Sequence, residues 1–85
     1  MASEEPVGKV THYYSNIGVA IIAVSAVIRN GDHIRIKGSS TDITQVVRSM
    51  QIQHINVEEA NEGDEIGLKV DGKVRKGDIV YKILQ

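Results

Sequence analysis

"RNGDHIRI" at residues 29–36 carries the pattern that decides the fold, because the same arrangement returns twice further along the chain. It recurs in altered form as "NEGDEIGLKV" at residues 61–70 and as "RKGDIVYKIL" at residues 75–84. In each copy a Gly-Asp pair precedes an alternating apolar run. Glycine accepts positive φ without a Cβ clash, and aspartate caps nearby backbone N–H groups. Each pair therefore predicts a turn at which the chain re-enters a β-sheet.

Alternating apolar and polar residues after these turns predict the strands themselves. Such alternation is typical of a strand with one buried face. After the Asn30-Gly31 turn, the inward side chains are expected to be Ile34 and Ile36, and the outward ones Arg35 and Lys37. After the second Gly-Asp pair, one buried face is expected from Ile66, Leu68 and Val70.

The remaining strands have less regular patterns. Residues 7–14 predict the first strand, and the apolar run at 19–28 predicts a second that is buried on both faces. Residues 43–55 predict one long strand in which Arg48 breaks the alternation, either at a barrel rim or at a β-bulge. We expect a helical turn or a wide loop at residues 56–64, and Val74 pointing inward from a wide connection before the last strand.

About six strands result, at spacings typical of an all-β barrel or sandwich. The sequence contains no long amphipathic helix that would cover a sheet face, so the sheet is expected to close on itself. The predicted fold is therefore all-β, a small closed barrel of six strands. We assign residues 7–85 to a single barrel domain and residues 1–6, "MASEEP", to a disordered N-terminal tail.

Composition limits the classes of function. The 85 residues include no cysteine, so neither disulfides nor thiolate metal sites hold the fold together. Ten Lys and Arg stand against eleven Asp and Glu, so any contact with nucleic acid would need a local patch of positive charge. No signal pattern is visible and the longest apolar run is too short to span a bilayer, which predicts a cytoplasmic protein without membrane contact.

Few residues suggest catalysis or metal binding. His12, His33 and His54 would ligate zinc only if the fold brought them together, and structural zinc sites favour thiolates and close ligand pairs. The paired acids at residues 4–5 and 58–59 have no neighbouring base, and no serine lies in a nucleophile elbow. Of the adjacent Tyr13 and Tyr14, one is expected to pack inside and the other to lie outside. We expect no enzyme activity, no metal and no cofactor.

Six cations are the candidate contacts with RNA or with another partner: Arg35, Lys37, Arg48, Lys73, Arg75 and Lys76. Such side chains contact phosphates and position RNA without reading its sequence. The alternative is a solvated surface of mixed charge, which is favoured by the neighbouring acids Asp32, Glu65, Asp71 and Asp78.

Three segments together resemble a known family. "VIRNGDHIRIKG", "VRSMQIQHINVEEANEGDEIGLKV" and "VRKGDIVYKI" are similar to the second domain of translational GTPases such as elongation factor Tu and initiation factor two. The nearest likeness is to short stand-alone proteins described as translation elongation factor-like. The resemblance spans Val7 to Ile83 and implies a six-stranded, Greek-key-like closed barrel.

The resemblance also implies partners: tRNA, ribosomal RNA or a ribosomal protein, and no DNA. No "GxxxxGK[ST]" phosphate loop occurs, so GTP hydrolysis is excluded. The leading hypothesis is thus a non-catalytic module that docks on RNA, the ribosome or a translation-associated protein. The second hypothesis is an accessory or protein-interaction barrel, like those at the C-terminus of some peptidases, acting with a larger enzyme in trans.

Overall fold

The structure is a computed structural model, and it describes residues 3–84. Within that range the secondary structure consists of ten strands, and none of it is helical. The predicted all-β class is confirmed. The strands are β1 (Ser3–Tyr14), β2 (Val19–Val24), β3 (Ile28–Arg29), β4 (His33–Lys37), β5 (Asp42–Val46), β6 (Met50–Ile52), β7 (Ile55–Val57), β8 (Glu59–Ala60), β9 (Glu65–Lys69) and β10 (Ile79–Leu84). No helix of residues 3–84 is long and apolar enough to cross a membrane.

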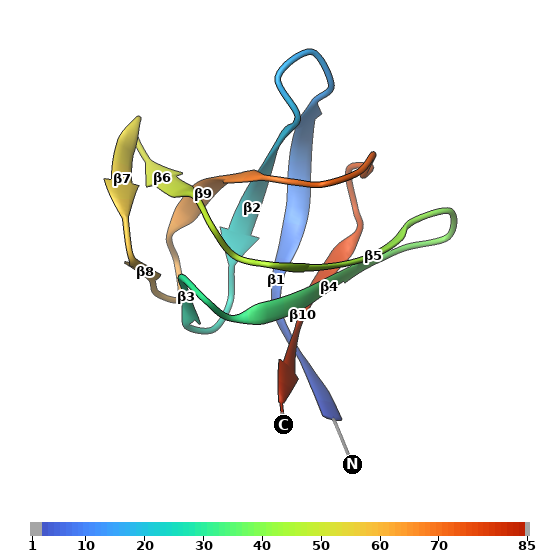
Figure 1. Ribbon diagram of the computed structural model, residues 1–85, viewed down its shortest axis with the longest axis horizontal. Helices are drawn as coiled ribbons and strands as arrows, with labels where there is room; N and C mark the ends of the chain where they lie inside the picture. Colours follow the sequence, from blue (N-terminus) through green and yellow to red (C-terminus); the bar gives the residue numbers. More distant parts are fainter. Residues whose placement is uncertain (1–2, 85) are drawn as a thin grey trace.

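Eight of the strands form one curled antiparallel sheet in the order β5-β4-β10-β1-β2-β9-β6-β7, and β3 pairs with β8 (Figure 1). This order has two ends, β5 and β7. The prediction of a closed six-stranded barrel is therefore wrong for the described residues, in both strand number and closure. The physical reason is local: residues 47–49 and 70–78 do not form strands, so the outer side of β5 has no strand partner.

A side chain bridges the place where closure fails. Gln45 on β5 is buried, with 6% of its surface exposed. Its amide nitrogen Nε2 donates to the carbonyl of Lys69 at 3.0 Å, and its Oε1 accepts from the N–H of Asp71 at 2.8 Å. One glutamine thus makes the two hydrogen bonds that a paired strand residue would otherwise make. The sheet curls around its core, and its hydrogen-bonded ladder stays open.

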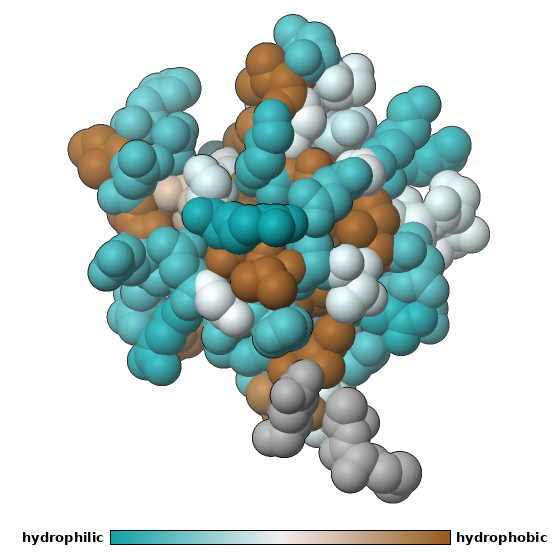
Figure 2. Space-filling view, viewed as in Figure 1, coloured by the Kyte–Doolittle hydropathy of each residue, from teal (hydrophilic) through white to brown (hydrophobic). Residues whose placement is uncertain are grey.

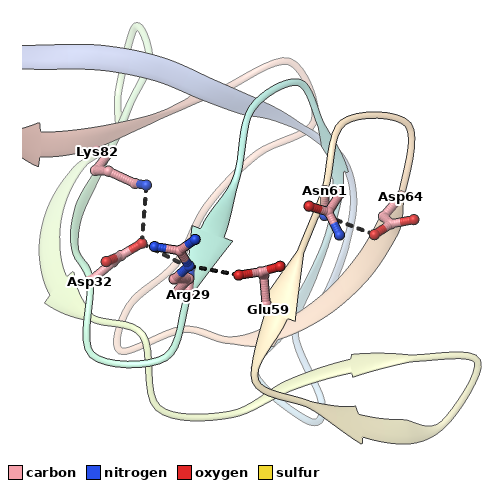
Figure 3. Close-up of polar contacts among 6 residues, drawn as sticks. All are labelled: Arg29, Asp32, Glu59, Asn61, Asp64 and Lys82. Carbon is pink, nitrogen blue, oxygen red and sulfur yellow. Dashed lines mark hydrogen bonds and ion pairs between the residues drawn. The ribbon is translucent and has the colours of Figure 1, made fainter.

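The three predicted Gly-Asp turns, at residues 29–32, 61–64 and 75–78, share one geometry. In each turn the first residue's N–H donates to the aspartate carboxylate, at 2.8, 2.8 and 2.9 Å. The aspartate N–H donates back to the first residue's carbonyl, at 3.1, 3.0 and 3.1 Å. Figure 3 shows the carboxylate contacts of the first two turns, and the ion pairs that Arg29 forms with Glu59 and Lys82 forms with Asp32.

The turn glycines have φ angles of 92°, 92° and 96°, which other residues adopt only with strain. A Cβ at any of the three would meet no atom within 4 Å. Glycine is therefore required here by the backbone conformation and not by lack of space.

Each Gly-Asp turn also docks on a buried valine of another segment. The glycine N–H donates to the valine carbonyl, and the valine N–H donates to the aspartate carbonyl, with all six distances between 2.8 and 3.0 Å. The valines are Val47 for the turn at 29–32, Val24 for 61–64 and Val10 for 75–78. The three turns therefore fix three separate crossings of the chain.

The core is mainly aliphatic, because the sequence contains neither Phe nor Trp. The expected inward residues Ile34, Ile36, Ile66 and Leu68 are each at most 1% exposed, and Val70 and Val74 are 7% and 2% exposed. Tyr13 packs against this core whereas Tyr14 is 46% exposed, so the expected opposition of the two tyrosines is confirmed.

Several boundaries differ from the predictions. The run at 19–28 divides into β2 and β3, and Ala23 is exposed, so that stretch is not buried on both faces. Residues 43–55 contain β5, β6 and a turn at Gln53-His54, and residues 56–64 contribute strands instead of a helical turn. Residues 3–6 extend β1, with Ser3 opposite Leu84, where a tail was expected; Met1 and Ala2 lie outside the described residues.

We predict that Asp78→Ala lowers the free energy of unfolding by about 1–3 kcal/mol, because the N–H of Arg75 loses its acceptor in a turn whose aspartate is 6% exposed. Urea unfolding followed by circular dichroism measures the change. Asp71→Ala is the matched control: its carboxylate only pairs with Arg48 at the surface, so its loss should cost less than about 1 kcal/mol. Equal losses in both variants would contradict the role given to the turn.

We predict that Gln45→Met lowers the free energy of unfolding by about 1–3 kcal/mol. Methionine has a similar shape but leaves the Lys69 carbonyl and the Asp71 N–H without their hydrogen-bond partners. Amide hydrogen exchange at Asp71 should also accelerate. The neighbouring exposed residue supplies the control, Thr44→Val, which should leave exchange at Asp71 unchanged.

Candidate functional site

A groove on the outer face of the sheet lies between the tips of hairpins β1–β2 and β6–β7. It encloses about 530 Å³, within the range typical of ligand pockets. Its lining comprises Tyr14, Ile17, Val19, Ile21, Gln51, Ile52, Gln53, His54, Gly63, Asp64, Glu65, Ile66 and Gly67. The lining combines apolar side chains with the two acids of the second Gly-Asp segment, Asp64 and Glu65.

The floor of the groove is formed by outward residues of β2 and β9. Along β2 the inward positions Ala20 and Ile22 are fully buried, whereas Val19 and Ile21 face outward and are half-buried. Gly67 lies opposite Ile21 on β9. A Cβ at Gly67 would lie 3.5 Å from Cγ1 of Val19 and 3.8 Å from Cδ1 of Ile21. The missing side chain therefore leaves a hollow with apolar walls.

Large apolar residues are exposed on both hairpins beside the groove. Tyr14 and Ile17 are 46% and 54% exposed, and Ile55, next to the tip of β6–β7, is 67% exposed. Figure 2 shows apolar surface over the loop of β1–β2 at the top of the view and at the left, where Figure 1 places β6–β7. Exposed apolar surface that gathers around a recess is typical of a binding surface.

The turn of hairpin β6–β7 is strained. Gln53 and His54 have φ angles of 51° and 66°, and both line the groove. Two-residue hairpin turns of this kind favour Asn-Gly, because residues with a Cβ cost roughly 1–2 kcal/mol each in the left-handed region. Such strain tends to occur at functional sites.

The charge in the groove is negative. Asp64 and Glu65 line its end near the second Gly-Asp turn, and neither Lys nor Arg is among its lining residues. Lys69 lies nearby, but its ammonium donates to the carbonyl of Ile17 at 2.9 Å and so holds the β1–β2 loop.

The six cations predicted as contacts divide into two groups. Arg35 on β4 forms ion pairs with Asp42 at 2.7 Å and with Glu4 at 3.1 Å, which links β4 to β5 and β1. The hydrogen bond from Arg35 holds the pKa of Asp42 below its usual value of 3.8, and these acids raise the pKa of the guanidinium. Arg48 pairs with Asp71 at 2.8 Å. Both arginines therefore already have acidic partners.

The other four cations, Lys37, Lys73, Arg75 and Lys76, are exposed, and no ion pair engages them within residues 3–84. Lys37 and Lys9 lie on either side of Ile79 in neighbouring strands, and the other three belong to the connection that leads into β10. We call these five residues the basic face: Lys9, Lys37, Lys73, Arg75 and Lys76.

The three histidines lie in three different structural settings. His12 meets Tyr14 edge to face, with ring centroids 6.1 Å apart, His33 begins β4, and His54 sits in the strained turn. In the described part of the chain, no three His, Asp or Glu residues form a group suited to a metal ion.

Sequence reasoning missed the groove. The apolar run at 19–28 was interpreted as buried on both faces, which concealed the outward positions of Val19 and Ile21. No period of two marks these positions in the sequence, because residues 19–24 are apolar throughout.

The comparisons with known proteins point to peptidases. No family model matches the chain. It is 41% identical over 76 residues to an uncharacterized protease of Methanocaldococcus jannaschii, covering 88% of this chain and 19% of that protein. It is 37% identical over 78 residues to a collagenase of Porphyromonas gingivalis, covering 89% of this chain and 22% of that one. The chain thus spans about a fifth of these curated relatives.

A solved structure has the same fold. It is the C-terminal domain of a Geobacillus thermoleovorans protein described as a U32 peptidase, with a TM-score of 0.86 and 21% identity, covering 92% of this chain and 91% of that domain. At this identity the match concerns the fold.

These findings overturn the translation-factor resemblance. The relatives are a protease and a collagenase, so the predicted kinship with elongation factors was wrong, and the RNA and ribosomal partners that it implied have no support from the relatives. The physical reason is that a Gly-Asp turn satisfies the backbone where a curled sheet changes direction, through a left-handed glycine and an aspartate that accepts a backbone N–H. Such turns are therefore not a signature of one function. The second hypothesis, an accessory domain associated with a larger peptidase, is the one that fits.

We predict that Arg35→Gln raises the pKa of Asp42 toward 3.8, because Arg35 supplies the largest lowering effect. NMR titration of the Asp42 carboxyl carbon measures it, and Lys37→Gln, which removes a weaker charge effect, should shift it less. The pKa of Asp42 is lower in the folded state than in the unfolded state, so the ionised carboxylate stabilises the fold at pH values above 3.8. This stabilisation is lost as the pH falls from 3.8 through the folded-state pKa. An unchanged Asp42 titration in Arg35→Gln would contradict the assigned pairing.

Proposed function

We propose that this chain is a non-catalytic accessory module that acts with a larger peptidase of the U32 type. The observation that carries the proposal is the 41% identity of 88% of this chain to only 19% of a longer protease. The remaining four-fifths of such relatives would hold the peptide-cleaving residues. The matched stretch covers nearly all of the chain, which supports treating residues 7–85 as one unit, and we propose a cytoplasmic location for it.

The basic face is the proposed contact with the peptidase. Its five cations lack acidic partners in residues 3–84, whereas Arg35 and Arg48 are neutralised. Arg35 and Arg48 are thus paired within the chain itself, and the four unpaired cations predicted from the sequence, with Lys9, are free to meet an acidic surface. Complementary charge of this kind speeds association and selects the partner.

We predict that the chain alone does not cleave gelatin, and that it binds the Methanocaldococcus jannaschii protease from which the matching 76-residue segment has been removed. Fluorescence anisotropy of the labelled chain measures binding, and gelatin hydrolysis measures activity. Lys73→Glu/Lys76→Glu should weaken binding by at least about tenfold, because two attractive contacts become repulsive.

The matched control is Arg29→Glu/Arg48→Glu, which changes the net charge equally at two arginines that are each 65% exposed and lie outside the basic face. It should alter binding by less than about twofold. Gelatin cleavage by the chain alone would refute the non-catalytic role. Absence of binding to the truncated protease would refute the accessory role.

A further inference from the structure

We propose that the groove between hairpins β1–β2 and β6–β7 binds an extended segment of a substrate polypeptide that carries an apolar side chain next to a Lys or Arg. This inference rests on the proposed accessory function and specifies its ligand. Three independent features of the groove support it: a free strand edge, an apolar hollow and a negative rim.

The free edge belongs to β9. Strand β9 pairs with β2 over five residues, but with β6 only at Leu68 and Gly67. Glu65 and Ile66 therefore have strand partners on the β2 side alone. The N–H of Lys69 donates toward Ser49 on the β6 side, at 3.4 Å. Because backbone direction alternates along a strand, the N–H and carbonyl of Glu65 point the same way, into the groove.

An extended peptide can pair with such an edge through its own backbone, and alternate side chains then provide specificity. A side chain directed toward the sheet would enter the hollow above Gly67. There it meets Val19 and Ile21, the two side chains within 4 Å of a Cβ at Gly67, while Gln51 lies opposite Gly67 on β6. The nearest partners are aliphatic, so the side chain they accept is apolar.

The rim sets the charge of the ligand. Asp64 and Glu65 lie at the end of the groove beside the free edge, and the groove lining has no Lys or Arg. The Asp64 carboxylate is held in place by the N–H of Asn61 at 2.8 Å. A cation adjacent to the apolar side chain would complement these two acids, whereas an acidic peptide would be repelled.

The position of the groove favours substrate over the peptidase itself. Ser3 and Leu84 are paired, so both described ends of the chain emerge together, at the bottom of Figure 1. Strand β1 has 12 residues and at roughly 3.3 Å per residue carries the chain some 35 Å from there to Tyr14 at the groove. A body joined at either end would leave this groove open. The 70–78 connection, which carries three of the five residues of the basic face, lies on the other side of the view.

The test uses the 85-residue chain and a short fluorescein-labelled peptide, Gly-Ser-Ile-Lys-Val-Lys-Ile-Ser-Gly, in anisotropy titrations. One comparison peptide has Glu in place of Lys, and another has Ser in place of Ile and Val. We expect the Lys peptide to bind and each comparison peptide to bind at least roughly tenfold more weakly.

Two protein variants test the location. Gly67→Val fills the hollow at a position where a Cβ makes ordinary contacts, and Glu65→Lys reverses the rim charge. Each should weaken binding of the Lys peptide by at least roughly tenfold. The control Glu58→Lys makes the same charge change on an exposed residue outside the groove and should have little effect. Thermal unfolding confirms that each variant is folded.

The proposal is overturned if the Lys peptide does not bind the wild-type chain up to about 1 mM, or if folded Gly67→Val binds it unchanged. Sedimentation that reveals a dimer dissociated by Gly67→Val would assign the groove to a second copy and also overturn it. Peptide binding without binding to the truncated protease would refute the accessory function and leave the groove's ligand standing. The reverse result would refute the groove's ligand alone.

Discussion

The paired hydrogen bonds between the three Gly-Asp turns and Val10, Val24 and Val47 are the constraint on which the rest of the structure depends. Each turn is closed internally by its aspartate and is then held at two points against a buried valine. An apolar residue lies three before each glycine and another three after it: Ile28 and Ile34, Ala60 and Ile66, Val74 and Val80. All six are buried. A docked turn therefore directs both flanking segments into one core without any large aromatic side chain.

Because the turns hold the crossings, the sheet does not need a continuous ladder. Gln45 spans the interval between β5 and the end of β9 with its side-chain amide, and short strands at the other end leave part of β9 unpaired. Both features arise where the chain departs from regular strand geometry, at residues 47–49 and at the Gln53-His54 turn. The free edge of β9, the strained turn and the hollow at Gly67 lie together at the groove, at the end of β9 away from the Gln45 bridge.

The charges on this small surface are separated into a basic region and an acidic region, which suits two different contacts. The net charge of −1 includes a basic face, on β1, β4 and the connection before β10, and acids at the groove rim. Arg35 and Arg48 form ion pairs with acids of the chain itself. An accessory module of a peptidase would use two such surfaces, one to meet the enzyme and one to hold the polypeptide that the enzyme cleaves. The two surfaces consist of different residues, so a substitution can change one and leave the other intact.

The sequence by itself determined the all-β class, the three turns, the inward sets on β4 and β9 and the burial of Val74. These are local properties: a left-handed glycine, a capping aspartate and a period of two are set by neighbouring residues. Only the tertiary structure decided that the ladder stays open at β5 and that the strand predicted at residues 43–55 is interrupted twice. It also decided which cations have no ion-pair partner. Those outcomes depend on partners distant in the sequence, such as Gln45 with Asp71 or Arg35 with Glu4. The groove was hidden for the same reason, since the apolar run at 19–28 cannot reveal which of its faces another strand covers.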